Sequence, residues 1–497
     1  MFSFIEAHPP ALVVFMLMSA FSMPTFAHFR RSLCGPVACI SMMISLACSI
    51  HLAKLVSDGT IIKYAVGGWL PPWGIEVIIN PFSAFILCVI SFICLLILLY
   101  SIPSLLHEIS AKTIGWYYTI FLLLVSAMYG MAITNDIFNM YVFIEVTGIS
   151  ACALVLAKNT KLATEAAFKY LLLATVGSGF VLFGISLLYL ITGHLNISYI
   201  ANEFALVYQQ YPFIIWVVMS FFLVGFGIKS ALFPLYIWLP DAHSAAPTTS
   251  SAILSGLVVK AYIVALIKIY FLIFGFELLN LLYIRHLILL MASAAIITGS
   301  LFAFAQLDLK RRLAYSSVAQ IGYIFLGIGL GSVTGLTAGI FHIFNHAVMK
   351  SCLFLSAGAI HYQTGKRQVN TLQGIGYEMP ITIGAFSIAA LSMIGLPLFS
   401  GFVSKWNLAL GSIETEMPLF VGLIILSGLL NAGYFLPIIW QAFFDVDSEK
   451  PKTFKLDKIP YPMLGTLVIL ALAVIYFGIM PEFPLSLARM AAETFLP

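Results

Sequence analysis

Seven ionisable residues lie inside stretches of the chain that are otherwise apolar enough to cross a membrane. Six are lysines and one is a glutamate: Lys169, Lys229, Lys260, Lys268, Lys350, Lys405 and Glu145. An ionisable side chain near the bilayer centre costs roughly 2.5–3.5 kcal/mol, so such residues usually mark an ion path or a proton relay. A desolvated lysine can lose its proton, whereas an arginine effectively cannot. This set of residues therefore predicts a proton relay.

Glu145 is the carboxylate of this set, and we expect it near mid-membrane. It follows Asp136 by nine residues, which is about 13 Å along a helix that rises 1.5 Å per residue. A carboxylate close to a lysine keeps the lysine protonated, and a carboxylate that moves away lets the proton go. The alternative is a structural carboxylate that is hydrogen-bonded to a neighbouring helix.

Lys229, Lys260 and Lys405 are the lysines expected to exchange protons. Lys229 lies five residues before Pro234, and Lys405 follows a break that begins at Gly395. Unwound backbone at membrane depth occurs where protein or a water-filled cavity satisfies it, so an ammonium group there can change partners. Lys260 is central in its span, and a mid-span position excludes easy snorkelling to the membrane surface.

Other ionisable residues allow a structural role as readily as a functional one. Lys268 lies two turns beyond Lys260 and nearer the end of its helix, and Lys169 lies near the start of its span. Asp241 and His243 follow the break in the seventh span. They are expected either to admit protons or simply to cap the turn.

His342, His346 and Lys350 are spaced four residues apart on one predicted helix. Successive members then lie on nearly one face, about 6 Å apart along the axis. Neutral imidazole both donates and accepts hydrogen bonds, so this row suits stepwise proton transfer. A purely structural histidine pair is the alternative. Because the HxxxH pattern has no carboxylate or cysteine ligand beside it, we expect no metal here.

The composition requires a membrane protein. Of the 497 residues, 61% are hydrophobic and 9% are charged, against about 25% charged in soluble domains. At about 20 residues per span, the chain can hold roughly fourteen helices. Apolar runs place them at 10–27, 34–53, 74–100, 114–133, 137–157, 166–192, 213–233, 248–275, 286–305, 315–331, 334–360, 380–411, 418–443 and 460–480.

Spans seven and twelve are interrupted by proline and glycine, which predicts broken helices at an ion pathway. The seven cysteines lie in or beside apolar runs without CxxC spacing, so we expect small core residues rather than disulfides or metal ligands. The first residues lack the basic region of a signal peptide, so the first span is expected to be retained.

The basic residues predict the topology. With the N-terminus outside, the cytoplasmic loops contain Arg30, Arg31, Lys112, Lys158, Lys161, Lys310, Arg311, Arg312, Lys366, Arg367, Lys450, Lys452, Lys455 and Lys458. The external loops contain only Lys54, Lys63, Arg285 and Arg489. This positive-inside bias predicts a multi-pass protein of the cell inner (cytoplasmic) membrane with both termini outside. The loop positions explain the net charge of +4, so no nucleic-acid partner is expected.

The chain also repeats itself. GFGIK (225–229) returns as GFVSK (401–405), and ILSGLVVKAY (253–262) returns as ILSGLLNAGY (425–434). Five spans separate equivalent positions, and an odd number turns the second copy upside down. We therefore expect an all-α polytopic membrane protein with two inverted five-helix repeats. The predicted divisions are an N-terminal three-helix segment, repeats of helices 4–8 and 9–13, and helix 14: 1–113, 114–275, 286–445 and 446–497.

Four stretches resemble a known family: NDIFNMYVFIEV (135–146), GFGIKSALFPLYIWLPDAHSAAPTTSSAILSGLVVKAY (225–262), FHIFNHAVMKS (341–351) and GLPLFSGFVSKW (395–406). They look like the antiporter-like subunits that Mrp-type sodium/proton antiporters share with respiratory complex I. The resemblance runs over nearly the whole chain. One departure is Ser255, where many complex I relatives carry a histidine.

The resemblance implies roles for these residues. Glu145 and Lys229 match the first-half pair of the family, Lys260 the link toward the centre, and Lys405 the terminal residue of the second half. His342, His346 and Lys350 match the eleventh-span row. Within the family, DIFNMYVFIEV is most similar to the D subunit of Mrp complexes, and lysine at 405 disfavours the M subunit of complex I.

The expected function is that of a proton-translocating subunit of a multisubunit monovalent cation (Na⁺)/H⁺ antiporter. Its expected partners are other membrane subunits, H⁺, Na⁺ and the lipid bilayer. No cofactor motif is present in the sequence, so we expect a transporter subunit rather than an enzyme. A proton-pumping subunit of complex I or of a membrane-bound hydrogenase is the alternative. A purely scaffolding membrane subunit is a further one.

Overall fold

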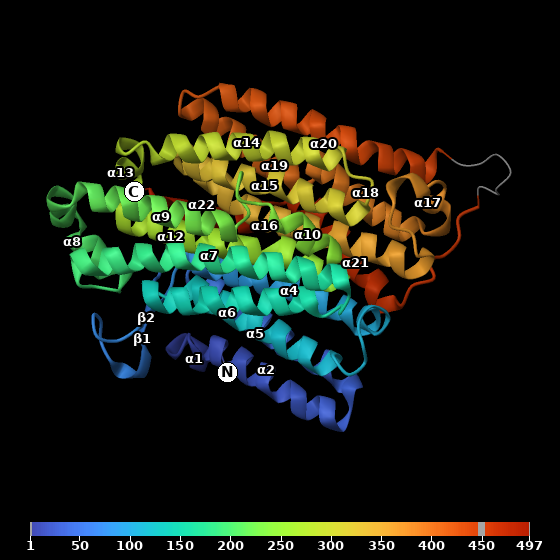
Figure 1. The fold of residues 1–497 in the computed structure, drawn as a ribbon, viewed down its shortest axis with the longest axis horizontal. Coiled ribbons are helices and arrows are strands. Elements are labelled where there is room, and N and C mark those ends of the chain that lie inside the picture. The colour runs from blue at the N-terminus through green and yellow to red at the C-terminus, as the bar shows by residue number, and fades with distance from the viewer. Residues whose placement is uncertain (1, 446–452, 497) are drawn as a thin grey trace.

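The computed structural model describes residues 2–445 and 453–496. Its long helices run side by side along the horizontal direction of Figure 1, as expected for a bundle that spans a membrane. Thirteen helices among the described residues are long and apolar enough to cross a bilayer. The broken pair α18–α19 completes fourteen spans, so the fold class predicted from the sequence is confirmed.

The spans fall into four groups along the chain. The first group is α2 (Ala11–Phe29), α3 (Cys34–Leu55) and α4 (Pro81–Glu108). The second is α5 (Ile114–Ile133), α6 (Ile137–Leu156), α7 (Lys161–Thr192), α9 (Pro212–Lys229) with α10 (Trp238–Ala245), and the run α11 (Thr248–Ile253), η3 (Leu254–Val258), α12 (Val259–Ile269), η4 (Tyr270–Phe274) and α13 (Gly275–Leu281). The third is α14 (Ile284–Phe304), α15 (Leu309–Leu330), α16 (Val333–Thr364), α18 (Pro380–Ile394) with α19 (Ser400–Glu414), and α20 (Leu419–Phe443). The last is α21 (Tyr461–Ile479).

Both predicted breaks are present. The seventh span stops at Lys229 and resumes at Trp238, and the twelfth stops at Ile394 and resumes at Ser400. The eighth span contains two π-helical turns, η3 and η4. Such turns interrupt the regular hydrogen-bond ladder and are frequent at functional sites. The first of them lies directly before Lys260.

The inverted repeat is visible in the backbone. Asp136 forms an isolated bridge with Asn196, and Asp308 forms one with Gln368, so both members of the first bridge recur at the same offset along the chain. Asp136 accepts a hydrogen bond from the Asn139 amide at 2.7 Å, and Asp308 accepts one from the Arg311 amide at 2.9 Å. Each aspartate thereby caps the first turn of a span, α6 or α15. We call the shared offset of these two bridges the bridge offset, and it relates the two copies residue by residue. The residue boundaries of the four divisions stay a prediction.

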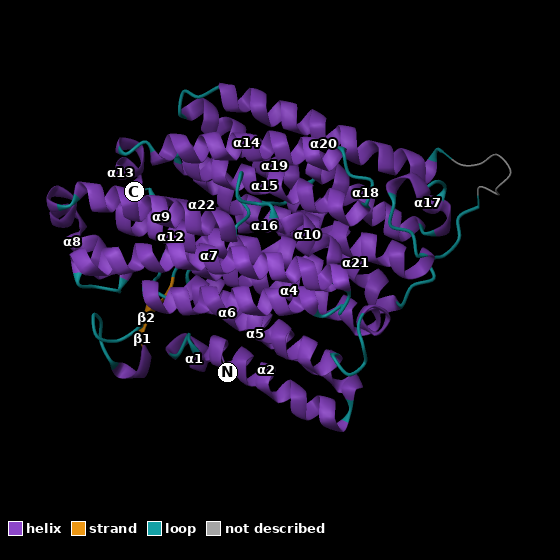
Figure 2. Cartoon of the chain, in the orientation of Figure 1, coloured by secondary structure: helices purple, strands orange, loops and turns teal. Residues whose placement is uncertain are grey.

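Several elements were not predicted. The strands β1 (Ile62–Ala65) and β2 (Glu76–Ile79) form an antiparallel hairpin, which is the orange element in Figure 2. The predicted start of the third span at residue 74 was therefore wrong, because this segment is a strand. Of the other elements, η1 (Arg31–Leu33) begins the span that contains α3. The rest lie outside the spans: α1 (Phe2–Ala7), η2 (Val66–Gly68), α8 (Ile197–Gln210), η5 (Val369–Thr371), α17 (Ile375–Glu378) and α22 (Glu482–Phe495).

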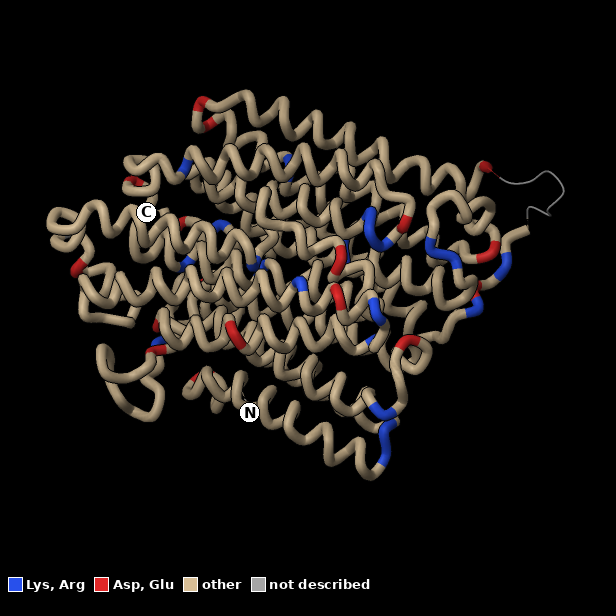
Figure 3. The backbone as a smooth tube through the Cα atoms, in the orientation of Figure 1, with Lys and Arg blue, Asp and Glu red and all other residues tan. Residues whose placement is uncertain are grey.

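The tenth span begins earlier than predicted. Lys310, Arg311 and Arg312 were assigned to a loop, but they form the first turn of α15, where Lys310 and Arg312 are buried. Their charges shifted the apparent start of the apolar run, although Asp308 is a typical N-cap. Lys450 and Lys452 lie outside the described residues. Figure 3 shows that many of the basic segments gather toward one end of the helices, the right-hand end, which we call the basic end.

Removing the first cap should weaken the fold measurably. Asp136→Ala leaves the Asn139 amide without its acceptor, and we expect a loss of about 1 kcal/mol in the free energy of unfolding. Thermal unfolding of the purified protein in detergent measures this effect. Asp136→Asn keeps the acceptor oxygen and serves as the control. An unfolding temperature as low for Asp136→Asn as for Asp136→Ala would contradict a capping role.

Candidate functional site

Glu145 and Lys229 form an ion pair inside the first repeat. Lys229 Nζ lies 3.4 Å from Glu145 Oε1, and the side chains are 1% and 32% exposed. Ser178 of α7 donates a hydrogen bond to the same carboxylate oxygen. The pair joins α6 to the last residue of the helix before the first break. The structure thus brings together two residues that the sequence singled out separately.

Glycines allow the helices around this pair to approach closely. A Cβ on Gly225 would lie 2.8 Å from the carbonyl oxygen of Gly177, so α9 and α7 pack backbone to backbone there. A Cβ on Gly148 would lie 3.7 Å from Lys229 Nζ, which means that the ammonium rests beside bare backbone. The ring of Tyr262 covers its other side, with the centroid 5.4 Å from Nζ. A cation over an aromatic face is attracted by the ring quadrupole.

Among the described residues, the partner of Lys260 is a backbone group. Its ammonium donates to the carbonyl of Ser255, which belongs to the π-helical turn before it. The Ser255 hydroxyl lies 2.7 Å from the Ser317 hydroxyl of α15. The serine at position 255 therefore connects the eighth and tenth spans, and Lys260 lies 2% exposed beside this link.

The two histidines of α16 lie one above the other, as their spacing predicts. The rings of His342 and His346 are stacked, with centroids 6.0 Å apart. His342 is held on both nitrogens, by Ser404 Oγ at 2.8 Å and by Gln320 Oε1 at 3.0 Å. Both ring nitrogens of His346 are buried without a protein partner among the described residues. His346 is therefore free to accept a proton from one side and donate to the other.

Lys350 of the same helix contacts α15. Its ammonium donates to the carbonyl of Leu313 at 2.7 Å and to the hydroxyl of Ser316. By the bridge offset, Lys350 corresponds to Ser178, and Glu145 corresponds to Ser317. The first repeat thus carries a carboxylate beside a serine, whereas the second carries a lysine beside serines. The corresponding pair of backbone positions therefore carries an anionic side chain in the first repeat and a cationic one in the second.

Lys405 lies at the second break. Its ammonium donates to the carbonyls of Met393 at 2.7 Å and Ile394 at 3.0 Å, the last residues of α18. The C-terminus of a helix carries partial negative charge, which stabilises a cation. Gly395 has φ of +94°, and a Cβ there would lie 2.9 Å from the Lys405 side chain. Glycine at 395 therefore makes both the turn and the close approach of the lysine possible.

The repeat partners Lys229 and Lys405 occupy different sides of their breaks. Lys229 ends the helix before its break, and Lys405 lies in the helix after its break. The two matching segments GFGIK and GFVSK are also farther apart along the chain than the bridge offset. Relative to the break, the lysine of the second repeat therefore lies farther along its span than the lysine of the first.

Two of the seven ionisable residues, Lys169 and Lys268, form no hydrogen bond or ion pair with the site residues described above. Lys169 is at the surface, where it pairs with Glu165 at 2.9 Å and Asp241 at 3.3 Å. Lys268 is buried and donates to the carbonyls of Ala132, at 3.1 Å, and Thr134. These carbonyls lie at the C-terminal end of α5, so the Lys268 ammonium satisfies backbone acceptors that the helix itself leaves without partners. The sequence left both lysines open between structure and function, and their contacts favour structure.

Asp241 and His243 lie on α10 at the basic end. Asp241 pairs with Lys169 of α7 and, at 3.0 Å, with Arg311 of α15. It therefore ties the first repeat to the second. His243 is fully buried, and neither of its ring nitrogens has a protein partner in the described part of the chain.

Sequence reasoning missed three residues of the site: Gln320, Ser404 and Lys310. Gln320 and Ser404 hold His342, and both are polar residues within apolar spans, a signal that was available. Lys310 is buried near the basic end and donates to the carbonyl of Ala246 at 3.0 Å. It was hidden among the arginines of the predicted loop.

The described residues contain no group of three or more His, Cys, Asp or Glu side chains arranged to hold a metal ion. Nor is any aspartate or glutamate among them fully buried. The interior thus contains buried lysines and histidines from both repeats, with the partly buried Glu145 beside Lys229. We call these residues the proton row: Lys229, Lys260, His342, His346, Lys350 and Lys405. Such a row has groups that bind and release protons in a low-dielectric setting.

Residues 134–430 match the family model described as NADH:quinone oxidoreductase/Mrp antiporter, TM. The N subunit of the NADH-quinone oxidoreductase of Desulforudis audaxviator (strain MP104C) is 37% identical, with 96% of each chain covered. The D subunit of the Na(+)/H(+) antiporter of Alkalihalophilus pseudofirmus (strain ATCC BAA-2126 / JCM 17055 / OF4) is 29% identical, over 96% of this chain and 95% of the relative.

Comparison with a solved structure also finds a likeness over nearly the whole chain. A chain of the membrane-bound sulfane sulfur reductase, an archaeal respiratory membrane complex, superposes with a TM-score of 0.90 and 31% identity. The superposition covers 98% of this chain and 97% of that one. The family model covers more than half of the sequence, and these likenesses extend over nearly all of it. The chain belongs to the NADH:quinone oxidoreductase/Mrp antiporter transmembrane family.

Proposed function

We propose that this chain is the proton-translocating subunit of a multisubunit monovalent cation (Na⁺)/H⁺ antiporter of the Mrp type. The observation that carries the proposal is the set of buried lysines and histidines to which both repeats contribute, with the Glu145–Lys229 pair in the first repeat and Lys405 in the second. The likeness to D subunits of Na(+)/H(+) antiporters supports the same assignment. We place the chain in the cytoplasmic membrane, with the basic end inside and both termini outside.

In the first repeat, the proton carrier is Lys229. Its ammonium is stabilised while it lies 3.4 Å from Glu145, because an opposite charge favours the charged form. Lys229 ends a helix at a break, so a small movement of α9 or α10 separates the pair. Once the pair has separated, Lys229 releases its proton in the direction of Lys260. When Lys229 takes up the next proton, its ammonium is again attracted to the Glu145 carboxylate.

In the second repeat, the proton passes through histidine. His346 has two free ring nitrogens among the described contacts and lies between Lys350 and His342 in sequence and along the helix. A neutral imidazole takes a proton on one nitrogen and releases one from the other. His342 continues the row to Ser404, the neighbour of Lys405. Lys405 then releases the proton at the second break.

Protons from the basic end are proposed to enter by way of Lys310. Its ammonium lies 3.4 Å from Ser251 Oγ, and Ser251 donates to the carbonyl of His243 at 2.7 Å. Lys310 also lines a small cavity with Lys158, His361 and Lys366. Lys310 therefore links this cavity to the backbone of the segment that carries the buried His243.

Lys310→Met should slow transport without abolishing it. Loss of a charged hydrogen-bond donor removes about 1.5–3 kcal/mol, which corresponds to about tenfold or more in rate. The initial rate of proton movement in everted vesicles measures this change. Lys161→Gln, at an exposed lysine of the same end, is the control. Full transport by Lys310→Arg, which cannot give up its proton, would show that Lys310 is only structural.

A second candidate function is that of a proton-pumping subunit in a redox-driven membrane complex. Two observations favour it: the 37% identity to an N subunit of NADH-quinone oxidoreductase and the 31% identity to a chain of a respiratory complex. The proton row serves either function. The two candidates differ in the other subunits and in what drives the protons.

The deciding experiment is purification of the intact complex from its native membrane. Small membrane subunits alone, together with sodium-dependent dissipation of a pH gradient in vesicles, would support the antiporter. Co-purifying flavin or iron–sulfur subunits, with proton movement that needs an electron donor, would overturn the antiporter in favour of the pump. Unchanged transport after loss of Glu145 and Lys229 would reduce the chain to a scaffold.

A further inference from the structure

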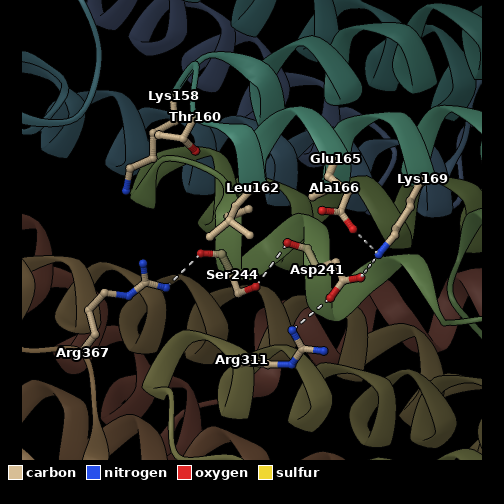
Figure 4. Close-up of a pocket in the computed structure, with 11 residues that line it drawn as sticks. Lys158, Thr160, Leu162, Glu165, Ala166, Lys169, Asp241, Ser244, Arg311 and Arg367 are labelled. Carbon is tan, nitrogen blue, oxygen red and sulfur yellow. Dashed lines mark hydrogen bonds and ion pairs between the residues drawn. The ribbon is translucent and has the colours of Figure 1, made fainter.

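A cavity of about 440 Å³ opens at the basic end between α7, α10 and α15. Figure 4 shows its charged lining. Four of the lining side chains are cationic and two are anionic: Lys158, Lys169, Arg311, Arg367, Glu165 and Asp241. The lining therefore carries an excess of two positive charges.

The two carboxylates are already engaged. Asp241 pairs with Lys169 at 3.3 Å and with Arg311 at 3.0 Å, and Glu165 pairs with Lys169 at 2.9 Å. Figure 4 shows these contacts on one side of the cavity, with Lys158 and Arg367 on the other. The acidic groups thus neutralise one half of the cavity. In the other half Arg367 pairs with Asp308 outside the lining, and Lys158 is the cation without an ion-pair partner among the described residues.

The remaining cations have donors to spare. Among the described residues, the Lys158 ammonium has no hydrogen-bond or ion-pair partner. Arg367 donates from Nη2 to the Ser244 carbonyl at 3.2 Å and pairs with Asp308 at 3.0 Å. Its Nε is buried without a partner in the same described part of the chain. An unsatisfied buried donor is costly, so an acceptor that reached Arg367 Nε would remove this cost.

Lys158 stands at the junction of this cavity with two smaller ones. It lines both the neighbouring cavity beside Lys310 and Lys366 and a third one of about 150 Å³ beside Glu108. The potential at Lys158 therefore has contributions from several nearby cations, reduced by the Glu108 carboxylate. A bound anion would be attracted by all of these cations.

We propose that this cavity binds the phosphate of an anionic phospholipid. Lysine and arginine are the usual phosphate ligands, and basic pockets at one face of a membrane protein bind anionic headgroups. The acyl chains have a surface beside the cavity. Leu172, Val176 and Phe183 are exposed on α7 and continue the helix face of Glu165 and Lys169 into the membrane.

The lipid source is favoured over free phosphate by the geometry of α7. Leu162 lines the cavity and is 72% exposed, so apolar surface reaches the rim of the charged site. A headgroup and a chain can then bind to one continuous surface. The proposal does not depend on which ion the complex exchanges.

The test uses the full-length protein, purified and delipidated in a neutral detergent. Native mass spectrometry follows titration with dioleoylphosphatidylglycerol, with dioleoylphosphatidylcholine or with inorganic phosphate. We expect phosphatidylglycerol to bind at one preferred site. Lys158→Gln should weaken that binding about tenfold, the usual effect of one lost charge-assisted hydrogen bond, and Lys158→Arg should restore it.

Lys112→Gln is the matched control, because Lys112 is an exposed lysine assigned to the same side of the membrane that does not line this cavity. An equal loss of binding in Lys112→Gln would overturn the proposal, since it would show attraction to general surface charge. Equal binding of inorganic phosphate and phosphatidylglycerol would overturn the lipid source. If the lipid binds the isolated chain but is absent from the purified intact complex, the proposal is overturned, because a partner subunit then occupies the cavity in the complex.

Discussion

Vesicles that carry Lys229→Ala are expected to lose sodium-dependent proton movement down to the level of vesicles without the complex. The substitution removes the amine that carries the proton and leaves Glu145 hydrogen-bonded only to Ser178. No other lysine among the described residues lies within ion-pair distance of that carboxylate. Fluorescence of a pH-sensitive amine in everted vesicles measures the effect.

The matched variant is Glu145→Gln, which keeps the size and the hydrogen bond from Ser178 but removes the charge. We expect a smaller but still severe loss, of about tenfold or more, because the free energy that holds the Lys229 proton changes by at least about 1.4 kcal/mol. The double variant should be no worse than Lys229→Ala alone, since both residues act on one proton. Full transport in Glu145→Gln would contradict their action as a pair. Recovery of the intact complex after affinity purification controls for assembly.

Lys405→Arg is expected to abolish transport although it keeps the positive charge. The amine donates to the carbonyls of Met393 and Ile394, and a guanidinium can make the same bonds. What an arginine cannot do is release its proton. A loss of transport with normal assembly therefore separates proton release from charge, and the same vesicle assay measures it.

Lys268→Arg is the control for this substitution. Lys268 also donates to carbonyls at a helix end, and we assign it a structural role only. Arginine there should keep most of the transport activity. Full activity of Lys405→Arg would contradict release at the second break, and equal loss in both variants would point to steric damage rather than to protonation.

The sequence was sufficient for the arrangement of spans and for the main pair. Apolar runs identify helices because a bilayer requires about 20 apolar residues per span. Pro234 and Gly395 mark the two breaks because proline and glycine destabilise a helix interior. Glu145 and Lys229 stood out because ionisable residues are costly at that depth. All these signals are local in the sequence.

Contacts between distant segments were beyond the sequence. The carbonyls that hold Lys268 belong to the end of α5, far away along the chain, and backbone acceptors leave no mark in a residue pattern. The hairpin β1–β2 was hidden because its apolar residues merged with the run of the third span. Gln320 was readable as a polar residue in an apolar helix, but its partner His342 became evident only from the packing of α15 on α16.

The shortage of carboxylates in the interior limits how many protons it can hold at once. Lys229, Lys260, Lys350 and Lys405 are all buried, and among the described residues only Lys229 has a carboxylate partner, the partly buried Glu145. Two like unit charges about 10 Å apart repel by roughly 1.7 kcal/mol at an effective dielectric constant of about 20. Occupancy of one amine therefore discourages occupancy of the next, and a proton that enters at one end displaces another at the far end. The buried amines would then hold a fixed number of protons, and electrostatic repulsion alone would couple the uptake of one proton to the release of another.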